Sequence, residues 1–111
     1  MLIINFAPSN INTWIMEHDY CYLNTDKMLE LSKNLDGSEI KMMLAIIYVL
    51  NNTEDYWFVN NASTREMLAS IGFAKSPERF SAILGSLVKK GVIKREANSV
   101  YSISRELYIV P

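Results

Sequence analysis

Hydrophobic and polar positions recur at helical spacing through residues 62–93 and predict two consecutive helices. The first is expected over residues 63–70, where Ser63 and Glu66 have the spacing of a capping box. Its apolar stripe is formed by Met67, Leu68 and Ile71. Gly72 follows at a position where a helix end favours a residue that accepts positive φ.

The second helix is expected to open at Ser76, a capping serine, with Pro77 at the first helical position. Its apolar face is formed by Phe80, Ile83, Leu84, Leu87 and Val88. Gly91 is expected to end it. Two such helices, joined by a turn of about four residues, have the arrangement of a helix-turn-helix.

A short hairpin is predicted directly after the second helix. Residues 92–95 and 100–103 have strand composition, and residues 96–99 form the turn, with Asn98 expected at positive φ. A helix-turn-helix followed by a hairpin is the order of a winged helix-turn-helix. The alternative is another small α+β domain that happens to contain a hairpin.

A central helix is predicted over residues 39–51, because this stretch is apolar around nearly its whole circumference. Ser38 with Asp36 is expected to cap it. A short helix at residues 24–33 precedes it, and an aromatic and β-branched strand at 56–59 follows it. This strand is expected to complete the sheet of the hairpin.

The two ends of the chain are apolar and are expected to be covered. Residues 2–6 predict a strand and residues 12–23 a second extended stretch, which we expect either the domain or a second copy to cover. The fold predicted is α+β, mainly α, with a small antiparallel sheet. It forms one domain over residues 1–111, with an amino-terminal extended segment at 1–23, a winged-helix core at 24–103 and a tail at 104–111 that packs back.

Composition supports a folded chain of 111 residues, half of them hydrophobic, with one cysteine and therefore no internal disulfide. The longest apolar runs are far shorter than the roughly 20 residues of a membrane span, and the amino end lacks the basic region of a signal peptide. These features predict a cytoplasmic protein that does not interact with membranes.

Charge is divided unevenly between the two halves. Residues 1–60 hold three Lys/Arg against eight Asp/Glu, a net charge of −5, whereas residues 61–111 hold eight against four, a net charge of +4. The basic half is the half that contains the predicted helix-turn-helix. Such asymmetry indicates nucleic acid as a partner.

An active site is not expected. His18, Asp19 and Cys21 form the only suggestive cluster, but in an extended segment residues 18 and 21 point to opposite faces. One His and one Cys also provide too few ligands for a structural zinc site. The sequence has no glycine-rich phosphate loop. We therefore expect no catalysis, no metal and no cofactor.

Candidate DNA contacts are the polar or small residues expected to face outward from the two helices and the wing. In the second helix, Glu78 and Ser86 are expected to face outward as well. Arg79 is the leading candidate, because arginine paired with guanine is the commonest specific contact. The full set is Arg65, Lys75, Ser76, Arg79, Ser81, Ala82, Lys94, Arg95 and Asn98.

Several of these stretches together resemble the RepL-type plasmid replication proteins of Firmicutes. The stretches are LDGSEIKMML (35–44), TREMLA (64–69), residues 76–87, KGVIKR (90–95) and VYSI (100–103). The resemblance implies a winged-helix protein that binds origin DNA and recruits host replication proteins.

The function expected is binding of double-stranded DNA by a plasmid or phage protein, first in replication initiation, with transcriptional regulation as an alternative that uses the same surface. A homodimer or another partner is expected to supplement the affinity of a single copy. A third interpretation is a winged-helix module that associates with proteins and does not bind DNA.

Overall fold

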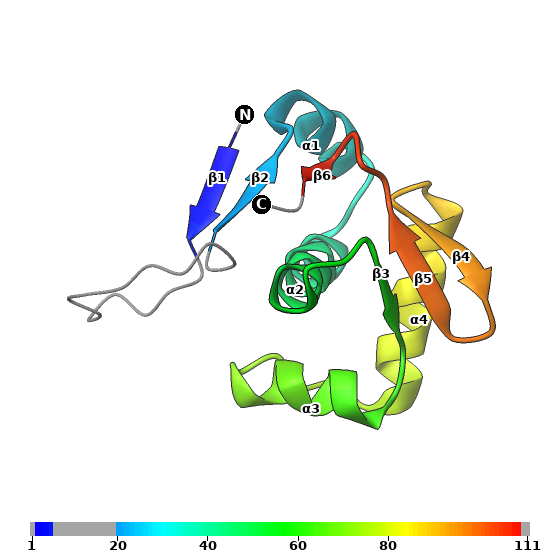
Figure 1. The fold of residues 1–111 in the computed structure, drawn as a ribbon. Helices are drawn as coiled ribbons and strands as arrows, with labels where there is room; N and C mark the ends of the chain where they lie inside the picture. The colour runs from blue at the N-terminus through cyan, green and yellow to red at the C-terminus, as the bar shows by residue number, and fades with distance from the viewer. Residues whose placement is uncertain (1, 6–19, 110–111) are drawn as a thin grey trace, which may run out of the picture.

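The computed structural model describes residues 2–5 and 20–109, and its elements follow the order of a winged helix. Its helices are α1 (Thr25–Ser32), α2 (Gly37–Thr53), α3 (Ala62–Ser70) and α4 (Pro77–Lys89). Its strands are β1 (Leu2–Asn5), β2 (Tyr20–Leu23), β3 (Trp57–Val59), β4 (Ile93–Ala97), β5 (Val100–Ile103) and β6 (Tyr108–Ile109). In Figure 1, α2 lies in the middle, with α3 below it and α1 above it.

Helix α2 begins at a reciprocal capping box. The Asp36 side chain accepts from the Glu39 N–H at 2.8 Å, and the Glu39 carboxylate accepts from the Asp36 N–H at 2.9 Å. Asp36 is therefore the N-cap, and Ser38, which was expected to share that role, lies inside the helix. The helix ends at Thr53, two residues beyond the expected end. Glu54, which caps it, has the left-handed conformation with φ 55°.

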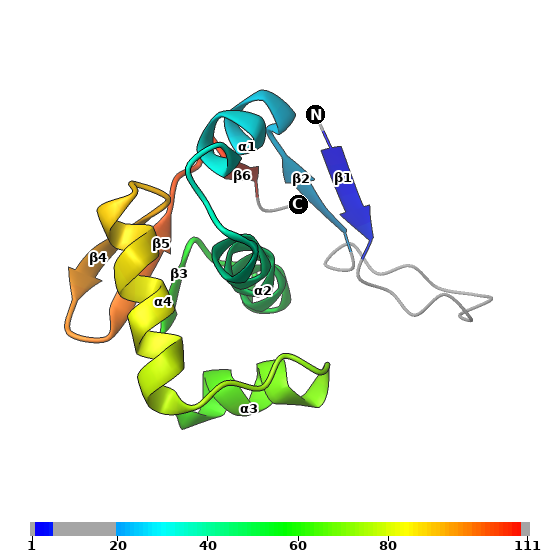
Figure 2. The same ribbon diagram turned by 180° about the vertical axis from the view of Figure 1, so that it is seen from behind.

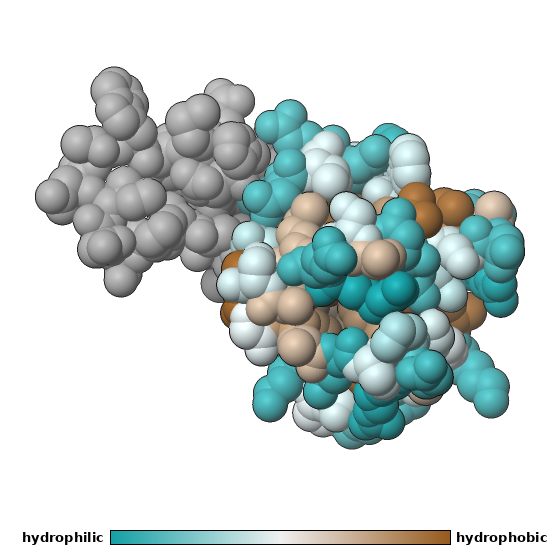
Figure 3. Space-filling model, turned by 90° about the horizontal axis from the view of Figure 1, so that it is seen from below, coloured by the Kyte–Doolittle hydropathy of each residue, from teal (hydrophilic) through white to brown (hydrophobic). Residues whose placement is uncertain are grey.

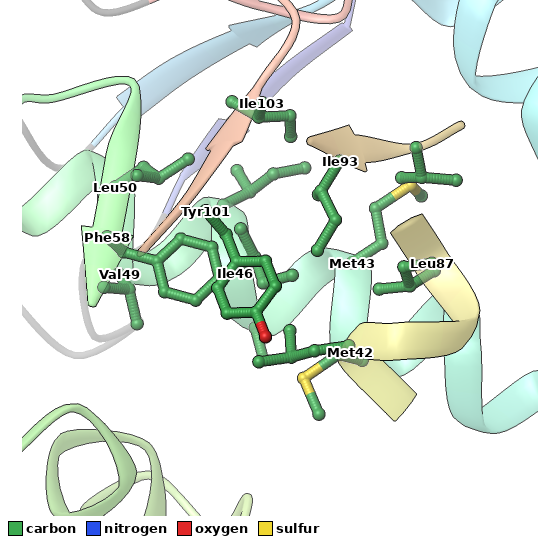
Figure 4. Packing of buried hydrophobic residues seen from close by; sticks show 14 of the residues in the cluster. Met42, Met43, Ile46, Val49, Leu50, Phe58, Leu87, Ile93, Tyr101 and Ile103 are labelled. Atoms are coloured by element: carbon green, nitrogen blue, oxygen red, sulfur yellow. The ribbon is translucent and has the colours of Figure 1, made fainter. Parts of the chain in front are cut away.

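The buried side chains of α2 confirm its central position. Figure 4 shows these side chains packed against residues from β3, β4, β5 and α4. The rings of Phe58 (β3) and Tyr101 (β5) stack with centroids 5.6 Å apart and lie over this helix. The α2 side chains in this core include Met42, Met43, Ile46, Val49 and Leu50.

Strands β3, β5 and β4 form an antiparallel sheet in that spatial order, so β3 completes the hairpin sheet as predicted. The turn differs from the expectation. Strand β4 extends to Ala97 through a bulge after Arg95, and Ser99, rather than Asn98, has positive φ, at 62°. The bulge adds one residue to β4 and so moves the turn toward the carboxyl end.

The helix-turn-helix consists of α3 and α4. Ser76 caps α4 and Pro77 is its first residue, as predicted. Helix α3 starts one residue earlier than expected, because Asn61 is its N-cap and accepts from the Thr64 N–H at 2.9 Å; the predicted capping box from Ser63 is wrong. The connection, residues 71–76, is longer than the four residues expected and includes Gly72 at φ 91°.

A second antiparallel sheet has the order β1-β2-β6 and brings the two ends of the described chain together (Figure 1). Leu107 and Tyr108 are fully buried, and the Leu107 carbonyl accepts from the Asn24 N–H at 2.9 Å. The tail therefore packs back on the domain, as predicted. Only the last four residues of the extended stretch predicted at 12–23 form a described strand; residues 12–19 lie outside the described residues.

Glu39 joins α2 to the carboxyl-terminal half of α4. Its buried carboxylate accepts from the Lys90 ammonium at 2.7 Å and from the Ser86 hydroxyl. These two hydrogen bonds, with that from the Asp36 N–H, lower the pKa of Glu39 to about 2 and outweigh the opposite effect of burial. Ser86 was expected to face outward, but it is half-buried because it contributes to this network.

Candidate functional site

Helix α3, the amino-terminal half of α4 and the turn of the β4–β5 hairpin lie along the lower part of the molecule (Figures 1 and 2). Figure 3 shows this side from below, where hydrophilic and weakly coloured residues cover most of the surface. The stronger hydrophobic colour is found mainly toward the edges. The helix-turn-helix and the wing therefore present a polar face, which we call the lower face.

The centre of the lower face is organised by Asn60, between β3 and α3. Its backbone N–H donates to the Ser99 carbonyl in the hairpin turn at 2.7 Å. Its side-chain oxygen accepts from Arg65 of α3 at 2.9 Å, and its side-chain nitrogen donates to the Ser81 hydroxyl of α4 at 3.1 Å. One residue thus connects the three elements of the lower face.

Two arginines lie around this centre, each hydrogen-bonded to a neutral amide. Arg65 is held by the neutral amide of Asn60, and Arg95 donates to the neutral amide of Asn98 at 3.1 Å. Among residues 2–5 and 20–109, no carboxylate pairs with either guanidinium group. Both arginines therefore keep their charge available for an anionic ligand.

Small side chains cover the neighbouring surface of α4. Ser76, Ser81 and Ala82 are all exposed, so another surface could approach the helix closely. Glu78, also exposed, adds a negative charge to the same helix and would repel phosphates. The amino-terminal part of α4 is thus accessible, but it offers few hydrogen-bonding groups for reading bases.

Lys75 lies in the turn between α3 and α4. Its ammonium group lies 5.6 Å from the centre of the Phe73 ring, close enough for a cation–π contact. Lys75 and Arg65 both line a shallow hollow of about 250 Å³, together with Ala62, Glu66, Ala69 and Ala74. The structure therefore brings these two cations to one part of the surface.

Arg79, the leading candidate from the sequence, lies away from the Asn60 centre. Residues of an α-helix follow one another at about 100°, so Arg79 and Ser81 leave α4 about 160° apart. Since Ser81 contacts Asn60, Arg79 extends from the opposite flank of the helix. Arg79 is exposed, but the structure does not group it with Arg65 and Arg95.

Lys94 and Arg95 are neighbours in sequence but occupy opposite faces of the hairpin. Arg95 pairs with Tyr101, whose ring is in the core, and so lies on the face toward α4. Lys94 is opposite Ser102 in the strand pairing, and its ammonium group lies 4.0 Å from the Glu96 carboxylate on the outer face. Side chains alternate along a strand, and this alternation separates the two cations.

The cluster of His18, Asp19 and Cys21 was considered as a possible active or metal site. His18 and Asp19 lie outside the described residues, and only the backbone of Cys21 is described, in β2. Among the residues that the structure does describe, no three His, Cys, Asp or Glu side chains gather as metal ligands.

Asn60 is the site residue that the sequence interpretation missed. It precedes a helix cap and looks like an ordinary loop residue, and its partners lie 5, 21 and 39 positions further along the chain. The only local sign is the Asn60-Asn61 pair directly before α3. One of the two asparagines caps the helix, which leaves the other available for a different role.

The architecture is that of a winged helix-turn-helix-like α+β fold with a polar lower face. Comparison of the chain with family models, curated proteins and solved structures gives no match. In the described part of the chain, none of the helices has the length and apolar character needed to span a membrane.

Proposed function

We propose that this protein binds double-stranded DNA through the lower face. The observation that carries the proposal is the set of hydrogen bonds made by Asn60, which joins the start of α3, the start of α4 and the hairpin turn. Beside it lie two arginines that pair with no carboxylate of the described residues. A helix flanked by a wing is the arrangement with which such folds enter a major groove and contact the adjacent backbone.

The contacts divide into two kinds. Arg65, Lys75 and Arg95 suit phosphates, because phosphate contacts need charge and position but no base-specific pattern. The second kind suits close approach and hydrogen bonding, and it includes Ser76, Ser81, Ala82 and Asn98. Arg79 could reach a base or phosphate from the opposite side of α4.

The affinity of one copy is expected to be modest, because the carboxylates of Glu78 and Glu66 lie nearby and repel phosphates. A second copy or another protein is expected to supplement it.

For the biological role we propose initiation of plasmid or phage replication, with recruitment of host replication proteins. This role depends on the RepL-type resemblance, since the geometry of the lower face serves a transcriptional regulator equally well. An origin-containing plasmid that replicates only when the protein is expressed would support initiation over regulation.

The proposal is tested by fluorescence anisotropy with a labelled mixed-sequence duplex, with protein added to about 100 μM, because non-specific binding has a Kd of about 10⁻⁴ to 10⁻⁶ M. The logarithm of the affinity should fall linearly with the logarithm of the salt concentration, by about 0.9 per phosphate neutralised. Arg95→Ala should weaken binding about tenfold, the scale of one charge-assisted contact, and flatten the salt slope.

Lys94→Ala is the matched control, since it removes the same charge from the neighbouring position on the outer face. It should change the affinity much less than Arg95→Ala does. Equal effects of the two substitutions would contradict the assignment of the lower face. No binding at low salt would instead favour protein association. Among the described residues, the exposed large apolar side chains that could make such contacts are Leu29, Leu44, Trp57 and Ile71.

A further inference from the structure

The Asn60 side chain hydrogen-bonds through both ends of its carboxamide and carries no charge. Its carboxamide is half-buried and uses both ends, accepting from Arg65 and donating to Ser81. At the same time it is neutral. An aspartate here could hold the same guanidinium group through a stronger, charge-assisted bond, but it would cancel the charge of the arginine.

The neutral side chain of Asn60 matters because it holds the charged side chain of Arg65 in place. The side chain is half-buried and is directed by the Asn60 oxygen at 2.9 Å, so much of its rotational freedom is already restricted. Ordering a long side chain on binding costs free energy, and this cost is smaller when the side chain is held beforehand. Arg65 has five N–H donors, and the bond to Asn60 uses one of them.

We propose that Asn60 is a positioning residue that holds Arg65 as a preset phosphate contact while leaving its positive charge uncancelled. The inference rests on the proposed binding of duplex DNA, and it assigns to Asn60 the role of ordering one of the phosphate contacts. The backbone bond from Asn60 to Ser99 fixes the hairpin turn against the same point, so the arginine and the wing keep a constant spacing.

The decisive variant is Asn60→Asp in the full chain. The carboxylate can still accept from Arg65, and the Ser81 hydroxyl can donate to its second oxygen, so the hydrogen bonds are preserved. The thermal midpoint should therefore be unchanged or higher. Duplex affinity in the anisotropy assay should fall about tenfold, with a salt slope shallower by about one.

Two controls separate charge from position. Asn34→Asp makes the same chemical change at an exposed residue in the turn that follows α1, and α1 lies at the opposite end of the molecule from α3. This substitution should leave the affinity within about twofold because charges beyond a Debye length are screened. Asn60→Ala frees the guanidinium group without altering its charge. It should weaken binding about threefold at an unchanged salt slope, since only ordering is lost.

A double-mutant cycle with Arg65→Ala completes the test. If Asn60 acts through Arg65, Asn60→Asp should have little further effect once Arg65 is removed. An equal loss of affinity with Arg65 present and with Arg65→Ala would mean simple repulsion of DNA by the new carboxylate, and it would overturn the inference. An Asn60→Asp variant that binds DNA as well as Asn34→Asp does would also overturn it. In both of these outcomes the wild type still binds, so the proposed function stands; absence of binding by the wild type overturns both proposals.

Discussion

Tyr108→Ala should destabilise the protein by about 3–5 kcal/mol, the range measured when a buried aromatic side chain is removed from a core. Tyr108 is fully buried although it lies near the carboxyl end of the chain. Its ring meets Tyr56 edge-on, with centroids 5.8 Å apart, and its backbone pairs with Leu23 in β2. Removing the ring would leave a cavity where the tail joins the two sheets.

Glu106→Ala provides the control for this experiment. Glu106 is exposed two residues earlier in the same tail, and a substitution at such a position should change the free energy of unfolding by no more than about 0.5 kcal/mol. Urea denaturation followed by circular dichroism measures both. A Tyr108→Ala variant with the stability of Glu106→Ala would show that the tail is not part of the core.

Glu39→Gln should remove much of the acid sensitivity of the fold. In the folded protein the pKa of Glu39 falls from 4.5 to about 2, first because of the hydrogen bond from Lys90, then because of those from Ser86 and the Asp36 N–H. A carboxyl group whose pKa is lower in the folded state stabilises the fold fully above its unfolded pKa. That stabilisation is lost as the pH falls from 4.5 to about 2.

Thermal unfolding at a series of pH values checks this expectation. Above pH 4.5 the glutamine variant should melt several degrees below the wild type, because it keeps the shape of the capping box but loses the charge that faces Lys90. Near pH 2 the two midpoints should converge. Parallel curves over the whole range would show that another group causes the acid sensitivity.

Features set by neighbours in sequence were the ones that could be predicted. Ser76-Pro77 marks the start of α4 because both residues act within one helical turn. The central helix was predicted because its apolar residues cover nearly the whole circumference. Helix starts were less certain where several caps compete: Asn61 takes precedence over Ser63, and Asp36 over Ser38, because the backbone is extended at Asn61 and Asp36.

The candidate site was predicted only in part, because its organisation depends on contacts distant in sequence. The sequence indicated the basic half and the correct elements, yet Asn60 acquires its role only when α4 and the hairpin turn meet it. The separation of Lys94 from Arg95 could have been predicted from strand alternation, had Arg95 been matched to the face of Tyr101. The inward orientation of Ser86 could not have been predicted, because its partner Glu39 is 47 residues away.

The most direct test of duplex binding by the lower face is a titration of the ¹⁵N-labelled full chain with a short duplex, followed by NMR. The account predicts that the amide signals that shift most belong to residues 60–65, 76–82 and 95–99. Shifts concentrated instead in α1 and the β1-β2-β6 sheet, or no shifts in excess duplex at low salt, would contradict it.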